Sequence, residues 1–130
     1  MAKSDHSILI VDDEEAFRYM LSSLLTGAGY TVETASDGIT AINAVQTRVF
    51  HVVLLDVKMP KVDGIEVLKF IKGNYPGVEA IMLTGVADIQ IAVECMKLGA
   101  FHYITKPPTS EDLLATIGRA LERRQLMIEN

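Results

Sequence analysis

The chain has 130 residues, 49% of them hydrophobic and 22% charged, so we expect one globular domain with one core. A net charge of −5 excludes the basic footprint of a nucleic-acid-binding domain. Apolar runs are too short to cross a membrane, the N-terminal stretch MAKSDHSILIV lacks a signal-peptide pattern, and the single cysteine fits a reducing compartment, which together predict a cytoplasmic protein.

Five short apolar segments predict strands. Three of them are continuous apolar runs, as in strands that are buried on both faces of a parallel sheet, whereas the second alternates and is expected near an edge. The segments are residues 8–11, 31–35, 52–55, 80–83 and 101–104.

Amphipathic patterns between these segments predict five helices. The first covers residues 14–28, with apolar residues spaced three and four apart. Asp37, Asp63 and Asp88 are expected to cap the next three, and Thr109 or Ser110 opens the fifth.

The fourth helix is expected to face the core with Ile89, Val93 and Met96. In the fifth, Leu114, Leu121 and Ile128 recur every seven residues, which suggests a longer helix or a coiled-coil linker.

The alternation of strands and helices predicts an α/β fold, a doubly wound parallel sheet with helices on both faces. In such sheets a ligand site lies at the carboxyl ends of the strands, where the strand order reverses. The chemistry is therefore expected at that edge.

Polar residues follow four of the predicted strands: Asp12, Asp13, Asp56, Thr84 and Lys106. Neighbouring carboxylates repel one another, so the acids need a cation, and carboxylate oxygens suit Mg²⁺. A carboxylate can also attack phosphorus, while an ammonium and a hydroxyl bind phosphoryl oxygens. The set predicts a magnesium-dependent phosphoryl site with Asp56 as the nucleophile.

The motifs IVDDE, LLDVKMPKVDG, MLTG and YITKP together resemble the receiver domains of two-component response regulators, over nearly the whole chain. The resemblance implies a flavodoxin-like fold of five strand–helix units with strand order 2-1-3-4-5, the order given for a member of this family. It also implies that Mg²⁺, or Mn²⁺ in its place, is held by Asp12, Asp13, Asp56 and the backbone carbonyl of Lys58.

Further roles follow from the same resemblance. Asp56 is the expected phosphoacceptor, Lys106 pairs with the phosphoryl group, and Thr84 is the switch hydroxyl. Tyr103 is expected to rotate into the space that Thr84 leaves, and the Lys106–Pro107 peptide bond is expected to be cis.

The resemblance implies a sensor histidine kinase as phosphodonor and a signalling phosphoacceptor that catalyses its own phosphorylation and slow dephosphorylation, not a conventional enzyme. LTGVADIQIAVECMKLGAFHYITKP resembles receivers of nitrogen-regulation type activators. Residues 1–130 are then one receiver domain, with a core over 7–122 and a helical tail over 123–130 leading to ATPase and DNA-binding domains; a stand-alone receiver is the alternative. A homodimer is expected on phosphorylation, with no nucleic-acid or membrane contact by this domain.

Two departures from the family pattern concern the rim of the site. Gly85 stands where alanine is common, which should leave the phosphoryl site more open. Val86, two positions after Thr84, offers no hydrogen bond to an attacking water, so we expect slow loss of phosphate.

Three other functions fit parts of the pattern. A haloacid-dehalogenase phosphatase would need a cap domain and a DxD motif after the first strand, whereas this strand ends in Asp12-Asp13 with no second acid at that spacing. A flavin-binding electron carrier would need a phosphate-binding loop where four acids stand, at residues 12–15. An interaction module that has lost phosphorylation could lack some residues of the family's site, whereas this sequence has a matching residue at every position of that site.

Overall fold

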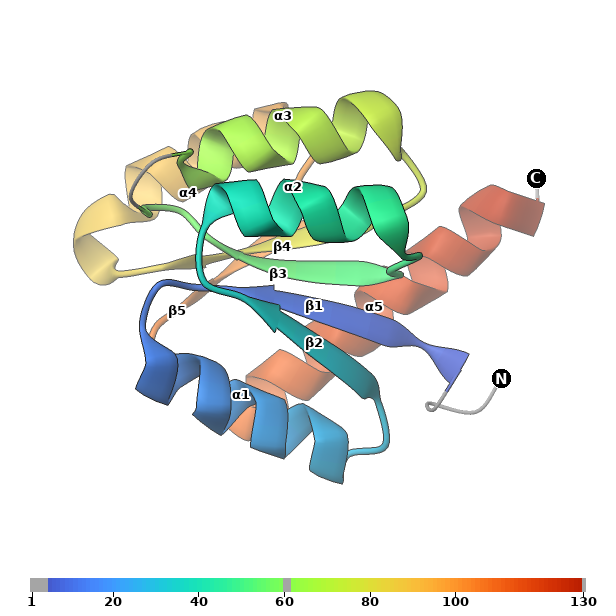
Figure 1. Cartoon of the computed structure of the whole chain (residues 1–130), viewed down its shortest axis with the longest axis horizontal. Helices are drawn as coiled ribbons and strands as arrows, with labels where there is room; N and C mark the ends of the chain where they lie inside the picture. Colours follow the sequence, from blue (N-terminus) through green and yellow to red (C-terminus); the bar gives the residue numbers. More distant parts are fainter. Residues whose placement is uncertain (1–4, 60–61, 130) are drawn as a thin grey trace.

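The computed structural model describes residues 5–59 and 62–129. Five strands form one parallel sheet in the order β2-β1-β3-β4-β5 (Figure 1). This order confirms the one that the resemblance implies. The strands are β1 (Ser7–Val11), β2 (Thr31–Ala35), β3 (Val52–Asp56), β4 (Glu79–Thr84) and β5 (His102–Thr105).

Five α-helices follow the strands in turn: α1 (Glu15–Gly27), α2 (Gly38–Thr47), α3 (Gly64–Asn74), α4 (Ile89–Lys97) and α5 (Ser110–Glu129). Figure 1 shows α2, α3 and α4 on one face of the sheet and α1 and α5 on the other. Among the described residues, no helix is both long and apolar enough to span a membrane.

The sheet divides the expected single core into two apolar layers. Leu9 and Val53 face the layer under α2, α3 and α4, whereas Ile8 and Val52 face the layer under α1 and α5. Because successive side chains of a strand point to opposite faces, both layers together demand continuous apolar runs. The runs in β1 and β3 meet this demand, and the more exposed β2 lies at the edge, as expected.

Three of the four predicted helix caps are confirmed. Asp37 Oδ1 accepts from the Thr40 N–H at 2.8 Å and Asp63 Oδ1 from the Glu66 N–H at 3.0 Å. At α5, Thr109 Oγ1 accepts from the Asp112 N–H at 3.0 Å. Each bond satisfies an N–H that the first helical turn cannot pair internally.

The prediction that Asp88 caps α4 is wrong. Its side chain makes no capping hydrogen bond, and a short 3₁₀ helix, η2 (Val86–Asp88), precedes α4. Asp88 Oδ1 instead lies 3.0 Å from Lys58 Nζ. An ion pair from a neighbouring loop has therefore replaced the local cap, and sequence spacing carries no sign of such a contact.

The predicted inward face of α4 is also wrong. Ala92 and Cys95 are fully buried, whereas Val93 and Met96 are 36% and 37% exposed. Moving the buried face by one residue turns a helix by about 100°, and α4 has apolar residues in both phases. The small side chains of Ala92 and Cys95 let the helix lie close to the sheet, and the larger ones are left outside.

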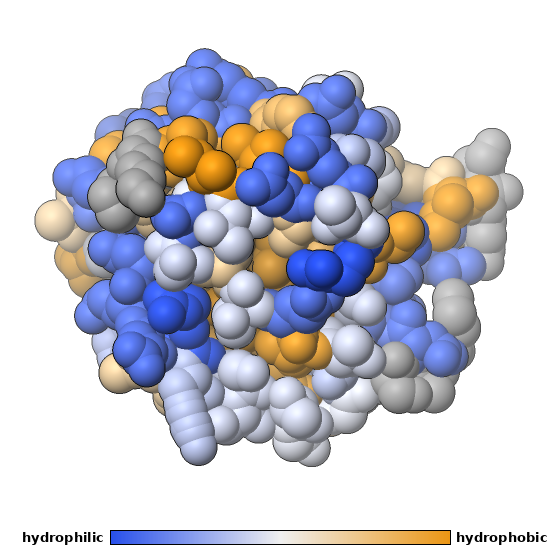
Figure 2. All heavy atoms as spheres, viewed as in Figure 1, coloured by the Kyte–Doolittle hydropathy of each residue, from blue (hydrophilic) through white to orange (hydrophobic). Residues whose placement is uncertain are grey.

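The helix α5 runs unbroken from Ser110 to Glu129, which confirms a long final helix. Arg123, in the expected tail, pairs with the buried Glu79 at the start of β4: Arg123 Nη2 donates to Glu79 Oε1 at 2.9 Å. Beyond this contact, hydrophobic residues of the last turns are exposed, and in Figure 2 they lie at the right-hand edge.

Candidate functional site

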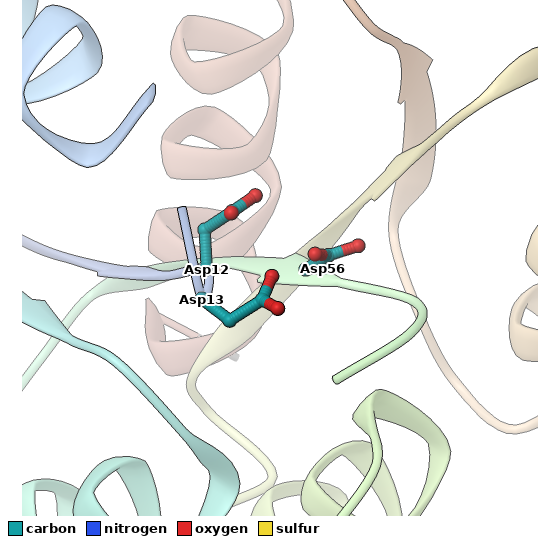
Figure 3. Close-up of side chains that lie close together, drawn as sticks. All are labelled: Asp12, Asp13 and Asp56. Atoms are coloured by element: carbon teal, nitrogen blue, oxygen red, sulfur yellow. The ribbon is translucent and has the colours of Figure 1, made fainter. Parts of the chain in front are cut away.

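Three acids gather at the carboxyl ends of β1 and β3 (Figure 3). One carboxylate oxygen of each of Asp12, Asp13 and Asp56 lies within 4.8 Å of the others. Asp12 is fully buried and Asp56 is 7% exposed, whereas Asp13 is exposed. The site therefore has a buried floor and an open side, at the sheet edge where the strand alternation predicts it.

Local hydrogen bonds fix the two buried acids. Asp12 Oδ1 accepts from the Glu14 N–H at 2.8 Å, and the Asp12 backbone carbonyl accepts from Arg18 Nη1 at 2.8 Å. Asp56 Oδ1 accepts from the Lys58 N–H at 3.3 Å. Each carboxylate keeps another oxygen free of these backbone bonds and directed to the site.

Close backbone packing also places Asp56. A Cβ on Gly64 would lie 2.1 Å from the Asp56 carbonyl oxygen and 2.9 Å from that of Val57. Glycine at the start of α3 therefore lets this helix approach the end of β3. The sequence pattern Asp63-Gly64 predicted a helix start, but it gave no sign of this contact.

Lys106, which follows β5, brings the positive charge to the acids. Its Nζ lies 2.6 Å from Asp12 Oδ2 and 3.3 Å from Asp56 Oδ2. Burial alone would lower the pKa of Lys106, but the hydrogen bond to Asp12 and the charge of Asp56 outweigh it and raise that pKa. The side chain is therefore a stable ammonium inside the site.

The electrostatic balance of the site remains negative. Burial, followed by the charge of Asp12, raises the pKa of Asp56 to about 6, against the opposing effect of Lys106. One ammonium is thus not enough to neutralise three clustered carboxylates. The surplus of hard oxygen donors fits a divalent cation such as Mg²⁺, which prefers such ligands and keeps several waters.

Thr84 ends β4 beside this cluster. It is buried, and its Oγ1 donates to the Gly85 carbonyl at 2.9 Å, while its own carbonyl accepts from the Lys106 N–H at 2.8 Å. The peptide bond that follows, between Lys106 and Pro107, is cis, as expected. Thr84 and Lys106 are therefore linked through the backbone at the site.

Tyr103 lies half-buried on β5, against the apolar layer under α2, α3 and α4. Its ring meets that of His102 edge to face, with 5.5 Å between the centroids. Tyr103 is two residues before Thr105, which pairs with Thr84 in the β4–β5 register. The two expected switch residues therefore lie on neighbouring strands.

The open side of the site continues into a hollow of ≈ 440 Å³. Its lining residues, which come from the end of β1, the loop after β3, α3 and α4, are Asp13, Val57, Lys58, Met59, Asp63, Ile65 and Ile91. The Lys58–Asp88 ion pair joins the loop after β3 to η2 at this hollow. The exposed acid Asp13 thus faces a hollow that is open to solvent.

One neighbour of the site has no signature in the sequence. Lys106 Nζ lies 4.7 Å from the centroid of the Phe17 ring, on α1. Phe17 fits the apolar periodicity of α1 and therefore reads as a core residue. Its place under a site lysine depends on how α1 packs on the sheet.

Residues 8–118 match the family described as "Response regulator receiver domain". The chain is 38% identical over 127 residues, 98% of its length, to transcriptional regulatory protein ZraR of Escherichia coli O157:H7, and 36% identical over 116 residues, 89% of its length, to DNA-binding transcriptional regulator NtrC of Klebsiella pneumoniae. It covers 29% and 25% of these two relatives.

Solved structures show the same similarity. NtrX from Brucella abortus superposes with a TM-score of 0.92 at 33% identity, over 99% of this chain and 29% of that one. The separate receiver domain of the same NtrX gives a TM-score of 0.85, with 88% of this chain and 98% of that chain covered. The part of NtrX that this chain matches is therefore its receiver domain.

Proposed function

This chain belongs to the family of response regulator receiver domains, whose general function is to accept a phosphoryl group, and we propose that Asp56 is its phosphoacceptor. The observation that carries the proposal is the place of Asp56: it ends the central strand β3, within 4.8 Å of Asp12 and Asp13 and 3.3 Å from the Lys106 ammonium. An attacking carboxylate, oxygen ligands and a cation thus meet at one point.

Asp12, Asp13 and Asp56 would hold a divalent cation, Mg²⁺ or Mn²⁺, together with the backbone carbonyl of Lys58. The fit rests on the three converging carboxylates and their surplus negative charge. When bound, the ion supplies positive charge for the phosphoryl oxygens. Binding also favours the ionised form of Asp56, which is the form that can attack phosphorus.

The proposed step is a transfer from a phosphohistidine of a sensor kinase. An Asp56 oxygen attacks phosphorus, a P–O bond forms, the P–N bond breaks, and the leaving imidazole takes a proton from solvent. Lys106 moves its ammonium from the aspartates to a phosphoryl oxygen and neutralises charge there. A small donor such as acetyl phosphate follows the same course, with acetate as the leaving group.

Thr84 and Tyr103 would transmit the change. In the structure Thr84 Oγ1 donates to the Gly85 carbonyl, and its hydroxyl would exchange this bond for one to a phosphoryl oxygen on Asp56. That movement changes the space beside Tyr103 on the neighbouring strand. The phosphoryl group thereby shifts the population between two packings of α4, β5 and α5.

The wider role is inferred from the relatives. A sensor histidine kinase is the proposed donor, and control of transcription by ATPase and DNA-binding domains in a longer protein is the proposed output, with residues 1–130 as the receiver unit and a cytoplasmic location. This support lies in the chain's match to part of longer transcriptional regulators. A homodimer formed on phosphorylation, and slow autodephosphorylation, complete the proposal.

The test is the intact mass of the protein after incubation with acetyl phosphate, with and without Mg²⁺. We expect the wild-type chain to gain one phosphoryl group only with Mg²⁺ and the Asp56→Asn variant to gain none. Asp63→Asn, which alters a helix cap beside the hollow, is the control and should still be modified. Absence of modification in the folded wild-type protein would overturn the proposal.

A further inference from the structure

The aromatic ring of Phe17 lies against the Lys106 ammonium, with 4.7 Å between Nζ and the ring centroid. We propose that Phe17 is a positioning residue, whose ring face holds Lys106 at the acidic site in readiness for phosphoryl oxygens. This inference rests on the proposed function of Lys106. Phe17 itself carries no group that could bind a metal ion or a phosphoryl oxygen.

The contact has a specific physical cause. The face of an aromatic ring is electrically negative and attracts an ammonium at this distance, whereas an aliphatic side chain of similar size does not. The Lys106 ammonium has three N–H donors, and the two buried aspartates lie within their reach. The Phe17 ring thus adds a neutral attractive surface to a cation that is already paired with acids.

Glu14 competes with the site for the Lys106 ammonium. Glu14 Oε1 lies 3.9 Å from Lys106 Nζ, and the Glu14 side chain is 69% exposed. An ammonium drawn toward Glu14 would leave the site for solvent. Phe17 opposes that movement, because its ring is anchored in the apolar layer under α1 and α5.

The ring contact also differs from the carboxylate contacts during the reaction. Lys106 must release Asp12 and Asp56 when these acids take up a metal ion or a phosphoryl group. The attraction to the Phe17 ring does not depend on the charge of either aspartate. Phe17 therefore keeps Lys106 within reach while its charged partners change.

Two substitutions of Phe17 separate the ring contact with Lys106 from apolar packing. Phe17→Leu keeps an apolar residue in the layer but removes the ring face, and Phe17→Tyr keeps both. Phe101→Leu is the matched control, because Phe101 packs in the same layer and lies under another cation, Arg123, at 5.1 Å. The phosphorylation rate of this control variant should equal that of the wild-type chain.

The experiment joins a spectroscopic and a kinetic measurement on the full chain. The proton NMR signal of the Lys106 ε-methylene, assigned with Lys106→Met, should be shifted upfield by the ring in the wild type and in Phe17→Tyr, and unshifted in Phe17→Leu. With acetyl phosphate and saturating Mg²⁺, Phe17→Leu should be phosphorylated ~3- to 10-fold more slowly and Phe17→Tyr within ~2-fold of wild type.

Two results would overturn the inference. One is a wild-type rate in Phe17→Leu despite loss of the upfield shift, and the other is an unshifted methylene signal in the wild type. A wild-type protein that accepts no phosphoryl group would refute the proposed function instead, and the NMR signal would still decide whether Phe17 holds the ammonium. Thermal unfolding of each variant shows that the chains compared are folded.

Discussion

Lys106 is bound more closely to Asp12 than to the proposed phosphoacceptor: its Nζ lies 2.6 Å from Asp12 Oδ2 and 3.3 Å from Asp56 Oδ2. The ammonium therefore neutralises the fully buried member of the acidic cluster when no other cation is present. A divalent cation on Asp12 competes with this ion pair. Lysine and metal thus share one task at the site, and their contributions can be separated by substitution.

This competition predicts that Lys106→Met makes the protein more dependent on Mg²⁺. Without its ammonium the site has a larger negative surplus, so the variant should be less stable than wild type in EDTA and should gain more in melting temperature from Mg²⁺. Asp13→Asn removes a proposed ligand and should gain less than wild type. Thermal melts at fixed ionic strength measure all three, and equal gains would contradict the shared role.

The raised pKa of Asp56 predicts a dependence of stability on pH. Since burial and the Asp12 charge raise this pKa from 3.8 to about 6 in the folded state, ionisation of Asp56 opposes folding. Its effect is absent below about pH 4, and the stability of the metal-free protein falls as pH rises from about 4 to about 6 and then stays level. The full effect above that pH is on the order of 2–3 kcal/mol.

Asp56→Asn should therefore raise the free energy of unfolding of the metal-free protein by about 1–3 kcal/mol at pH 7.5, and by little at pH 4. Urea denaturation in EDTA at the two pH values measures this difference. Glu66→Gln, a change of an exposed carboxylate, is the control and should show no such dependence. A destabilised Asp56→Asn at pH 7.5 would refute the electrostatic account.

The close approach of α3 to β3 predicts that Gly64→Ala damages both stability and phosphorylation. An added Cβ would lie 2.1 Å from the Asp56 carbonyl oxygen, and backbone atoms on both sides must move apart. We expect a loss of about 2–3 kcal/mol in urea denaturation. Gly73→Ala, in the same helix with no atom within 4 Å of the added Cβ, should be neutral or stabilising.

At the opposite end of the sheet, Glu79 predicts a second stability effect. It is 1% exposed, is paired with Arg123 and lies 3.7 Å from Lys72 Nζ. Arg123→Ala leaves this buried carboxylate with weaker neutralisation and should cost about 1–3 kcal/mol of unfolding free energy. Arg119→Ala, one turn earlier on α5, should cost much less, and similar losses in both would show that the Glu79 pair contributes little.

The aliphatic side chain of Val86 predicts that the phosphorylated protein loses its phosphoryl group slowly. Val86 is 73% exposed at the start of η2, two residues after Thr84, and its side chain has no group that can orient water. Val86→Gln should raise the rate of phosphate loss about fivefold, the effect of one added hydrogen bond in the transition state. The decay of the phosphorylated mass measures it, Val49→Gln at an equally exposed distant position is the control, and unchanged decay would contradict the prediction.

The sequence determined the strands, the alternation and the set of site residues. Continuous apolar runs identify strands that are buried on both faces, and parallel strands bring Asp12, Asp56, Thr84 and Lys106 to one edge whatever the details of packing. Asp37, Asp63 and Thr109 were predictable as caps because their partners lie three residues away.

Only the tertiary structure decided contacts between segments that are distant in the chain. Asp88 pairs with Lys58 instead of capping α4, the side of α4 that carries Ala92 and not Val93 faces the core, and Phe17 meets Lys106. Helical periodicity identifies the buried face of a helix only when the apolar residues lie on one side, and in α4 they lie on two sides. Side-chain pairs across helices and loops depend on how the elements pack, which local propensity and spacing do not encode.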